Sequence, residues 1–426
     1  MLKKLSISGF KSILDAQLEF GRVNLFIGAN GSGKSNILEA IGVLSTALCR
    51  DITETELQRK GVRLSEPVLF KSAFKACEMQ SNFGLKAELE GDVCYHINIT
   101  AGESIGTLRF FSEEILHDSI SYLGRSNHGI RLQGVSKSRD DVSPERGLWD
   151  RFQSVIDLPD VLVNTLNKLA RFCIYAPQTS FLRGTESERT QIKPIGLLGG
   201  GLPQAAATVF EQIEDLQSSN RQHAARMREI LEVVWMPGWA SACVIDHPGL
   251  QTYASQAKSA DLVVFFVDRF LRSERNLLSA YDSSEGSLYL LFMAILMLHP
   301  ESPKLFALDN VDNSLNPAAT RAFLEKIIYV TGNQRFQRYN IGPEQVFLTS
   351  HNPTSLDAFD LFNDDQRVFV VSRASRTGFT TVYRLQPAEG MTKAKWIKTF
   401  KGKNLSELWI DGSITDALGV QGQSVL

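Results

Sequence analysis

A glycine-rich loop near the amino terminus constrains the fold of this chain more than any other feature. Residues 28–35 read GANGSGKS, which fits the pattern G-x-x-x-x-G-K-[ST]. The apolar run VNLFIG precedes the loop, and apolar residues from Ile37 to Leu48 recur after it at helical spacing. A loop that joins a strand to a helix in this way lets backbone N–H groups surround phosphates at the helix N-terminus. The sequence therefore predicts an α/β fold with a nucleoside triphosphate site.

The charged and hydroxyl side chains of this loop suit a triphosphate and its metal ion. Lys34 would neutralise the β- and γ-phosphates, and the Ser35 hydroxyl would bind Mg²⁺. The alternative is an ordinary glycine-rich turn, which the flanking strand and helix disfavour. The residues of this region predicted to bind ATP are Gly28, Asn30, Gly31, Ser32, Gly33, Lys34, Ser35 and Asn36.

Two apolar runs far downstream end in polar side chains. Residues 304–309 read KLFALD, a Walker B pattern that ends in Asp309, and residues 345–351 read QVFLTSH, which ends in His351. Because ligands of open α/β sheets gather at the carboxyl ends of strands, Asp309 is predicted to bind Mg²⁺ beside Ser35. His351 is predicted to sense the γ-phosphate. The alternatives are a buried strand with a solvated aspartate and a structural histidine, and the pairing with the phosphate loop favours the functional interpretation.

A short polar run precedes the most apolar segment of the chain. Residues 283–287 read SSEGS, and the apolar run Leu288–Leu298 follows. This run is too short to span a bilayer, which takes roughly 20 residues per crossing, so it is predicted to be a buried helix. Small hydroxyl residues and a glycine at its N-terminus would suit an anion. Taken alone, this pattern is as consistent with a simple helix cap.

The composition limits the classes of protein to be considered. The 426 residues are 43% hydrophobic, enough for a large core, and the net charge of -2 provides no overall attraction to nucleic acid or membrane. The five cysteines are scattered with no CxxC pair, which favours reduced structural thiols. The amino-terminal residues lack the apolar core of a signal peptide. We therefore expect a cytoplasmic protein with no membrane-spanning segment.

The four motifs are the phosphate loop, SSEGS, the Walker B strand and the strand that ends in His351. Together, and in their order along the chain, they resemble the ABC-type ATPases of the RecF, SMC and OLD group. The resemblance covers residues 1 to about 40 and 280–385. In that group a turn like GFKS, here residues 9–12, leads into the phosphate loop, and SSEGS matches the signature sequence. The D-loop is matched by NSLNP at residues 313–317, and the switch histidine by His351. No long heptad run is present, so the coiled-coil arm of SMC proteins is absent.

The resemblance also implies further site residues and a fold. YAPQ at residues 175–178 looks like the Q-loop of the group, which makes Gln178 a third metal ligand beside Ser35 and Asp309. The implied fold is an α/β P-loop ATPase head of the ABC and RecF type, with a mixed sheet, an antiparallel β subdomain and an inserted helical lobe. The strand-like runs between residues 66 and 133, separated by Gly, Asn and Ser, favour that subdomain independently.

The implied domains are not continuous along the chain. The head is expected to comprise residues 1–199 and 281–390, with the β subdomain at about 66–133. Helical patterns at 200–280 predict the inserted lobe, and 391–426 form a C-terminal tail. The charged segment at about 134–160 is predicted to be an exposed loop.

The resemblance implies an assembly as well. Two subunits would pack head to tail, and Ser284, Glu285 and Gly286 of one would contact the ATP held by the phosphate loop of the other. The expected self-association is thus a homodimer, with higher oligomers as a further possibility. The DNxDNSLNP pattern, the NLSELWIDG ending and the missing arms look like stand-alone ATPases of bacterial defence operons, with the ATPase subunit of the Septu anti-phage system as nearest match. The implied function is ATP-gated control of a partner nuclease.

One departure from the group concerns hydrolysis. The residue after the Walker B aspartate is normally a glutamate that orients the attacking water, and here it is Asn310. Asp312, two residues further on, is the alternative base. The predicted catalytic residues are therefore Asn310, Asp312 and His351, and turnover is expected to be slow.

Three other functions are alternatives for this sequence. A RecF-like or RecN-like repair ATPase would need a basic channel for DNA, to which Lys3, Lys4, Lys393, Lys395, Lys398, Lys401 and Lys403 could contribute, although they also suit a solvated face. An intrinsic nuclease is disfavoured because only about forty residues follow residue 385. A transporter subunit is disfavoured by the roughly 250 residues between the phosphate loop and SSEGS.

Overall fold

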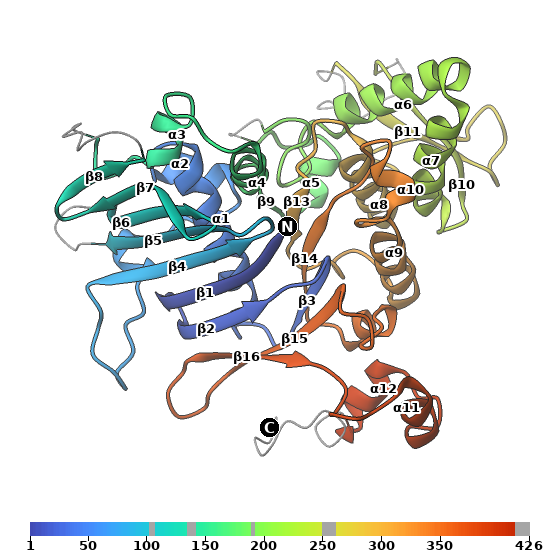
Figure 1. The fold of residues 1–426 in the computed structure, drawn as a ribbon. Helices are drawn as coiled ribbons and strands as arrows, with labels where there is room; N and C mark the ends of the chain where they lie inside the picture. Colours follow the sequence, from blue (N-terminus) through green and yellow to red (C-terminus); the bar gives the residue numbers. More distant parts are fainter. Residues whose placement is uncertain (102–106, 134–141, 189–191, 249–260, 414–426) are drawn as a thin grey trace. The chain divides into compact units, whose positions relative to one another are not determined.

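The computed structural model describes residues 1–101, 107–133, 142–188, 192–248 and 261–413 (Figure 1). Contacts divide the chain into two units. The first unit comprises residues 1–174, 303–310 and 345–426, and the second comprises 175–302 and 311–344. The chain thus crosses between the units after residues 174, 302, 310 and 344. None of the helices in the described ranges is long and apolar enough to cross a membrane.

A six-stranded mixed sheet carries the phosphate loop. Its strand order is β16-β15-β3-β14-β13-β9. Strands β15, β3, β14 and β13 pair in parallel, and β16 is antiparallel to β15. Every residue of β3, β13 and β14 is buried, as continuous apolar runs predict for parallel strands covered on both faces. The strands are β3 (Val23–Ile27), β9 (Cys173–Tyr175), β13 (Leu305–Leu308), β14 (Gln345–Ser350), β15 (Gln366–Arg373) and β16 (Thr380–Leu385).

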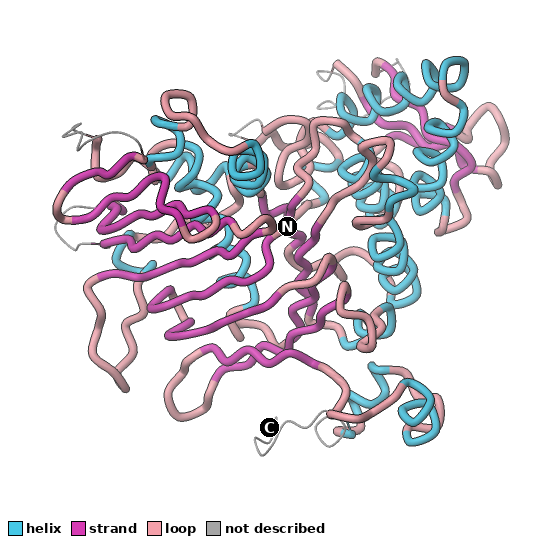
Figure 2. The backbone as a smooth tube through the Cα atoms, viewed as in Figure 1, coloured by secondary structure: helices cyan, strands magenta, loops and turns pink. Residues whose placement is uncertain are grey.

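A seven-stranded antiparallel sheet forms the rest of the β structure of the first unit, and Figure 2 shows its strands in magenta. Its order is β2-β1-β4-β5-β6-β7-β8. Burial alternates along β4, as expected for a sheet with one face on the core. The predicted α/β head with a mixed sheet and an antiparallel β subdomain is therefore confirmed. The strands are β1 (Leu2–Phe10), β2 (Ile13–Glu19), β4 (Asn82–Leu89), β5 (Val93–Ala101), β6 (Leu108–His117), β7 (Ile120–Ser126) and β8 (Gly129–Leu132).

Short helices complete the core of the first unit around α1 (Lys34–Cys49), which is buried over most of its length. They are α2 (Glu54–Arg59), α3 (Leu148–Phe152) and α4 (Asp160–Ala170). Part of the segment predicted as an exposed loop is instead helical and buried, since Trp149 is only 1% exposed. The cause is a long-range contact, because the Leu148 N–H donates to the buried Glu113 carboxylate at 3.0 Å. Residues 134–141 lie outside the described residues.

The expected C-terminal tail begins with two short helices in the first unit, α11 (Lys393–Thr399) and α12 (Leu405–Ile410). The backbone N–H and the hydroxyl of Ser406 both donate to the Asp357 carboxylate, at 2.8 and 2.7 Å. This contact fastens α12 to the turn after β14. Residues 414–426 are outside the described residues.

The second unit is mainly helical. Its helix α8 (Glu285–Leu298) is apolar all round and buried from Ser287 onward, as the sequence predicts. The 200–280 segment contains the expected helices α6 and α7 but also a three-stranded sheet, so it is not a purely helical lobe. The remaining elements are α5 (Thr179–Leu182), α6 (Leu202–Ser219), α7 (Arg221–Leu231), β10 (Ala240–Asp246), β11 (Val263–Asp268), β12 (Leu277–Ser279), α9 (Pro317–Val330) and α10 (Gln334–Gln337).

Candidate functional site

The phosphate loop joins the end of β3 to the first residue of α1, and two of its glycines, Gly28 and Gly33, are fixed by close packing. A Cβ at Gly28 would lie 2.0 Å from the Val371 carbonyl oxygen. A Cβ at Gly33 would lie 2.3 Å from Thr380 Oγ1, and Gly33 also has a left-handed φ of 108°. No other residue fits either position without moving β15 or β16, because such distances are far below van der Waals contact. The loop conformation is therefore held by the sheet around it.

Lys34 folds back over this loop. Its Nζ donates to the carbonyl oxygens of Gly28 and Ala29, at 2.7 and 2.9 Å, and the residue is 6% exposed. The ammonium therefore lies inside the curve of the loop, where the loop amides and the N-terminus of α1 favour an anion. This placement suits contact with the phosphates of a nucleotide.

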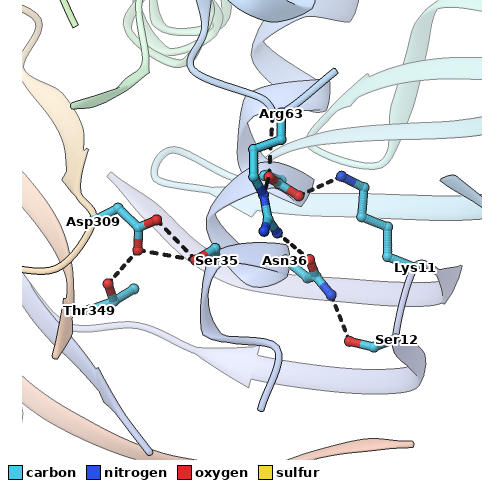
Figure 3. Close-up of polar contacts among 8 residues, drawn as sticks. Lys11, Ser12, Ser35, Asn36, Arg63, Asp309 and Thr349 are labelled. Atoms are coloured by element: carbon cyan, nitrogen blue, oxygen red, sulfur yellow. Dashed lines mark hydrogen bonds and ion pairs between the residues drawn. The ribbon is translucent and has the colours of Figure 1, made fainter. Parts of the chain in front are cut away.

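The structure places Ser35 and Asp309 side by side, although 274 positions separate them in the chain. The Ser35 hydroxyl donates to the two Asp309 carboxylate oxygens at 3.1 and 2.9 Å (Figure 3). The cause is the parallel pairing of β3, β14 and β13, which brings the carboxyl ends of these strands to one edge. A hydroxyl and a carboxylate beside a phosphate loop are the oxygen ligands that suit Mg²⁺.

Thr349 completes this group, and the sequence analysis assigned it no role. Its hydroxyl donates to Asp309 Oδ1 and accepts the Asn310 backbone N–H at 2.8 Å. The residue is fully buried near the end of β14. Thr349 thus fixes both the carboxylate and the start of the turn that follows it. A hydroxyl near the end of an apolar strand, two positions before His351, was the available signal.

We expect Thr349→Val to raise the Mg²⁺ concentration needed for ATP binding about tenfold. Valine preserves the shape but removes the hydroxyl, and a lost hydrogen bond to a charged group costs about 1.5–3 kcal/mol. Thr349→Ser is the matched control because it keeps the hydroxyl. The measurement is a Mg²⁺ titration of ATP binding in the wild type and both variants. An unchanged Mg²⁺ requirement in Thr349→Val would show that Thr349 does not orient Asp309.

The three predicted catalytic residues occupy different environments. Asn310 is exposed and has a left-handed φ of 56°, a conformation that asparagine tolerates better than most residues. His351 is exposed directly after β14. Asp312 lies in the second unit, is only 8% exposed, and adds to the effect of burial in raising the pKa of Tyr289. Its burial beside Tyr289 is a poor setting for a base that must reach water.

A buried carboxylate on α1 ties the phosphate loop to the turn between β1 and β2. Glu39, 2% exposed, pairs with Lys11 Nζ at 2.6 Å and with Arg63 Nε at 2.5 Å. Arg63 also donates to Asn36 Oδ1 at 2.9 Å, and Asn36 donates to Ser12 Oγ at 2.6 Å (Figure 3). Asn36 was predicted to bind ATP, and its side chain is here engaged with protein groups.

The charges of this cluster are set by burial and pairing. Burial lowers the pKa of Lys11, opposed by its contact with Glu39. The hydrogen bond to Glu39 raises the pKa of Arg63, and Asp309 adds to this rise, so the guanidinium also experiences the charge of the Asp309 carboxylate. Arg63 has no motif around it, and the sequence analysis missed it.

A cavity of about 450 Å³ opens beside the cluster in the first unit. Its walls include Lys11, Asn36, Arg63, Phe74 and Arg373. Cationic groups and an aromatic ring therefore surround a space next to the first turn of α1. Such a lining suits the base and ribose of a nucleotide whose phosphates lie on the loop.

The second unit contains the remaining residues that were predicted to contact ATP or its metal ion. Ser284 is the exposed N-cap residue of α8, and Gly286 approaches Ser314 so closely that a Cβ there would lie 3.0 Å from the Ser314 carbonyl oxygen. Glu285 accepts a hydrogen bond from Ser314 Oγ at 2.6 Å. Gln178 is exposed as the N-cap residue of α5. The SSEGS turn and the turn at residues 313–316 thus form one contiguous group in this unit.

Two family models match the chain. One described as "AAA ATPase domain" matches residues 1–114, and one described as "AAA domain, putative AbiEii toxin, Type IV TA system" matches residues 169–357. These two ranges of the chain are therefore similar to ATPase domains. The phosphate loop lies in the first matched range, and Asp309, SSEGS and His351 lie in the second.

Curated relatives include DNA replication and repair proteins RecF. That of Shewanella halifaxensis is 33% identical over 154 residues, which are 36% of this chain and 39% of that protein. That of Magnetococcus marinus is 52% identical over 46 residues, 11% of this chain and 12% of that protein. The chain therefore matches well under half the length of these relatives.

Solved structures similar to this chain include an SMC head bound to the C-terminal winged-helix domain of ScpA. It is 14% identical, with a TM-score of 0.49, and the match covers 92% of this chain and 99% of that one. A structure of the recombination mediator protein RecF is 12% identical, with a TM-score of 0.35, covering 87% of this chain and 95% of that one.

Proposed function

We propose that this protein is an ATP-dependent clamp whose two copies close around ATP and that nucleotide occupancy, rather than rapid turnover, is its signal. The observation that carries the proposal is the arrangement of Ser35, Asp309, Thr349 and Asn310. The first three are joined by hydrogen bonds in an arrangement that would suit a metal ion beside phosphates. The fourth is the residue directly after Asp309, where the resembling ATPases carry a water-activating glutamate and this chain carries an asparagine.

The chain's own residues account for nucleotide binding. The loop amides and Lys34 would hold the phosphates, and the cavity beside Arg63 and Phe74 would take the base and ribose. Ser35 and Asp309 would hold Mg²⁺, with Gln178 as a further candidate ligand. When bound, Mg²⁺ would neutralise charge on the β- and γ-phosphates. His351, exposed after β14, would respond to the γ-phosphate.

The exposed N-terminus of α8 supports the dimer. Ser284 is exposed, and a helix of 14 residues presents unpaired N–H groups and a positive dipole end there. In a head-to-tail pair, Ser284 and Gly286 of one copy would meet the γ-phosphate held by the other. The dimer interface would then contain both nucleotides, so that ATP links binding to assembly.

We expect Ser284→Arg to bind ATP but not to associate in its presence. The long side chain would fill the space that the partner's γ-phosphate must occupy. Ser284→Ala is the control, because the Ser284 side chain makes no capping hydrogen bond in α8 and its loss should cost little. Light scattering with and without Mg-ATP measures association. Normal ATP-dependent association of Ser284→Arg would reject the shared site.

We further propose that the clamp controls a partner effector, a nuclease, in bacterial defence against phage. The family description that names the AbiEii toxin supports a link to toxin or defence systems. The ATPase subunit of Septu systems is the specific candidate, supported by the DNxDNSLNP pattern and by NLSELWIDG at residues 404–412.

A DNA-binding repair ATPase is the second candidate, favoured by the sequence similarity to RecF. Its predicted basic channel receives less support. Lys393 pairs with Asp360 at 2.6 Å, and Lys403 pairs with Asp411 at 2.7 Å. Salt-sensitive binding of the purified protein to duplex DNA in the presence of ATP would favour this second candidate over an effector-controlling clamp.

A further inference from the structure

Glu285 is turned toward its own unit. Its Oε1 accepts hydrogen bonds from two hydroxyls, that of Ser314 at 2.6 Å and that of Thr179. The bond from Ser314 contributes most to lowering the pKa of the Glu285 carboxyl, followed by the bond from Thr179, and nearby Arg183 adds to this. The residue is exposed, yet one of its oxygen atoms accepts hydrogen bonds from hydroxyls of two separate segments of the chain.

These contacts join three segments of the second unit. Thr179 begins α5, Glu285 begins α8, and Ser314 lies in the turn that leads to α9. Arg183, which follows α5, donates to the Ser283 carbonyl oxygen at 3.3 Å. The start of α8 is therefore held from α5 at two places.

The Ser314 turn needs such support. Ser314 has a left-handed φ of 62°, which is unfavourable for a serine. Its carbonyl oxygen lies so close to Gly286 that a Cβ would fall 3.0 Å away. The hydrogen bond from Ser314 Oγ to Glu285 thus holds a strained turn against the first residues of α8.

A carboxylate is a poor ligand for a triphosphate, because like charges repel. The structure shows the Glu285 carboxylate occupied by hydroxyls of its own unit instead. The prediction that Glu285 contacts ATP directly therefore fits this geometry less well than a supporting role does. Ser284 and Gly286, on either side, remain the groups that would face the anion.

We propose that Glu285 is a positioning residue that locks α5, the N-terminus of α8 and the Ser314 turn into one preformed block, which docks as a whole on the partner's nucleotide. This inference rests on the proposed ATP-dependent dimer. Without Glu285 the block would have to be ordered during association, and that ordering would weaken the dimer. Binding of ATP to the phosphate loop of a single copy would be unaffected.

The test compares ATP-dependent association of the full chain in Glu285→Ala and Glu285→Gln. Glu285→Ala should weaken association at least about tenfold, as expected for lost hydrogen bonds to a charged group. At protein concentrations too low for association, its affinity for a fluorescent ATP analogue should stay near wild type, as should its melting temperature without nucleotide. Glu285→Gln should largely restore association, because its amide oxygen can still accept both hydroxyls.

The two donors provide a further check. Ser314→Ala and Thr179→Val should each weaken association and should add little to Glu285→Ala, because all three remove parts of one network. Wild-type association in Glu285→Ala, with Ser284→Arg failing to associate, would overturn the positioning role alone. Normal association of Ser284→Arg would instead reject the proposed dimer. A Glu285→Gln variant as defective as Glu285→Ala would also contradict the inference, because charge would then matter and not the shared acceptor.

Discussion

Replacing Lys34 with alanine should weaken ATP binding by about 100-fold. The ammonium lies inside the phosphate loop, where it now donates to the carbonyl oxygens of Gly28 and Ala29. A nucleotide would take over that donor, and losing one or two charge-assisted hydrogen bonds costs about 1.5–3 kcal/mol each. Alanine also leaves the phosphates without their nearest positive partner. The measurement is a titration with a fluorescent ATP analogue.

Lys60→Ala is the matched control for this experiment. Lys60 is also a buried lysine of the first unit, 8% exposed, and its ammonium donates to a main-chain carbonyl, that of Ala170. It therefore tests the loss of a buried ammonium outside the phosphate loop. If Lys34→Ala binds the analogue as well as wild type and Lys60→Ala do, the loop is not the nucleotide site.

Introducing a carboxylate at position 310 should accelerate hydrolysis, provided that the local turn is kept. A general base typically contributes about 10²–10⁴-fold, and the amide of Asn310 is not a useful base at neutral pH. The structure shows a conformational cost of this substitution that could not be predicted from the sequence. Asn310 has a φ of 56°, and a left-handed conformation costs roughly 1–2 kcal/mol for most other residues. The gain in Asn310→Glu is therefore expected toward the lower end of this range.

Asn310→Gln separates the gain from a general base from the cost of the left-handed backbone. Glutamine has the size and backbone preference of glutamate but is not a base. Steady-state hydrolysis should rise in Asn310→Glu and stay slow in Asn310→Gln. Asp312→Ala completes the set, because Asp312 is the alternative base. Fast hydrolysis by the wild type that is lost only in Asp312→Ala would show that Asp312 activates the water despite its burial.

The parts of the site that could be predicted from the sequence are of two kinds. Some depend only on neighbouring elements along the chain, and others lie at the carboxyl ends of parallel strands. The phosphate loop needs only the strand before it and the helix after it, and both are present. The contact between Ser35 and Asp309 follows from a general rule of parallel sheets, that strand ends share an edge. The buried helix α8 follows from an apolar run bounded by SSEGS.

The missed features depend on partners far away in the chain. Thr349 matters because it faces Asp309, and Arg63 because it faces Glu39 and Asn36. Neither residue carries a motif of its own. The buried helix α3 within the expected loop likewise depends on the distant Glu113 carboxylate.

Weak local patterning explains the remaining fold error. The strand β10 was missed because its sequence, ASACVID, has small residues and little alternation. Its antiparallel pairing with the more apolar β11 stabilises the extended conformation that its own residues favour only weakly. Strand formation here is decided by a neighbour and not by propensity.

The most direct test of an occupancy-driven clamp follows mass and phosphate release together after the wild-type protein is mixed with Mg-ATP. Light scattering reports association, and a phosphate sensor reports hydrolysis in the same sample. The mass is expected to double on ATP binding and to stay doubled for minutes, falling only as phosphate appears. A mass that never rises while phosphate is released steadily would contradict it, because ATP would then be turned over by single copies without forming a clamp.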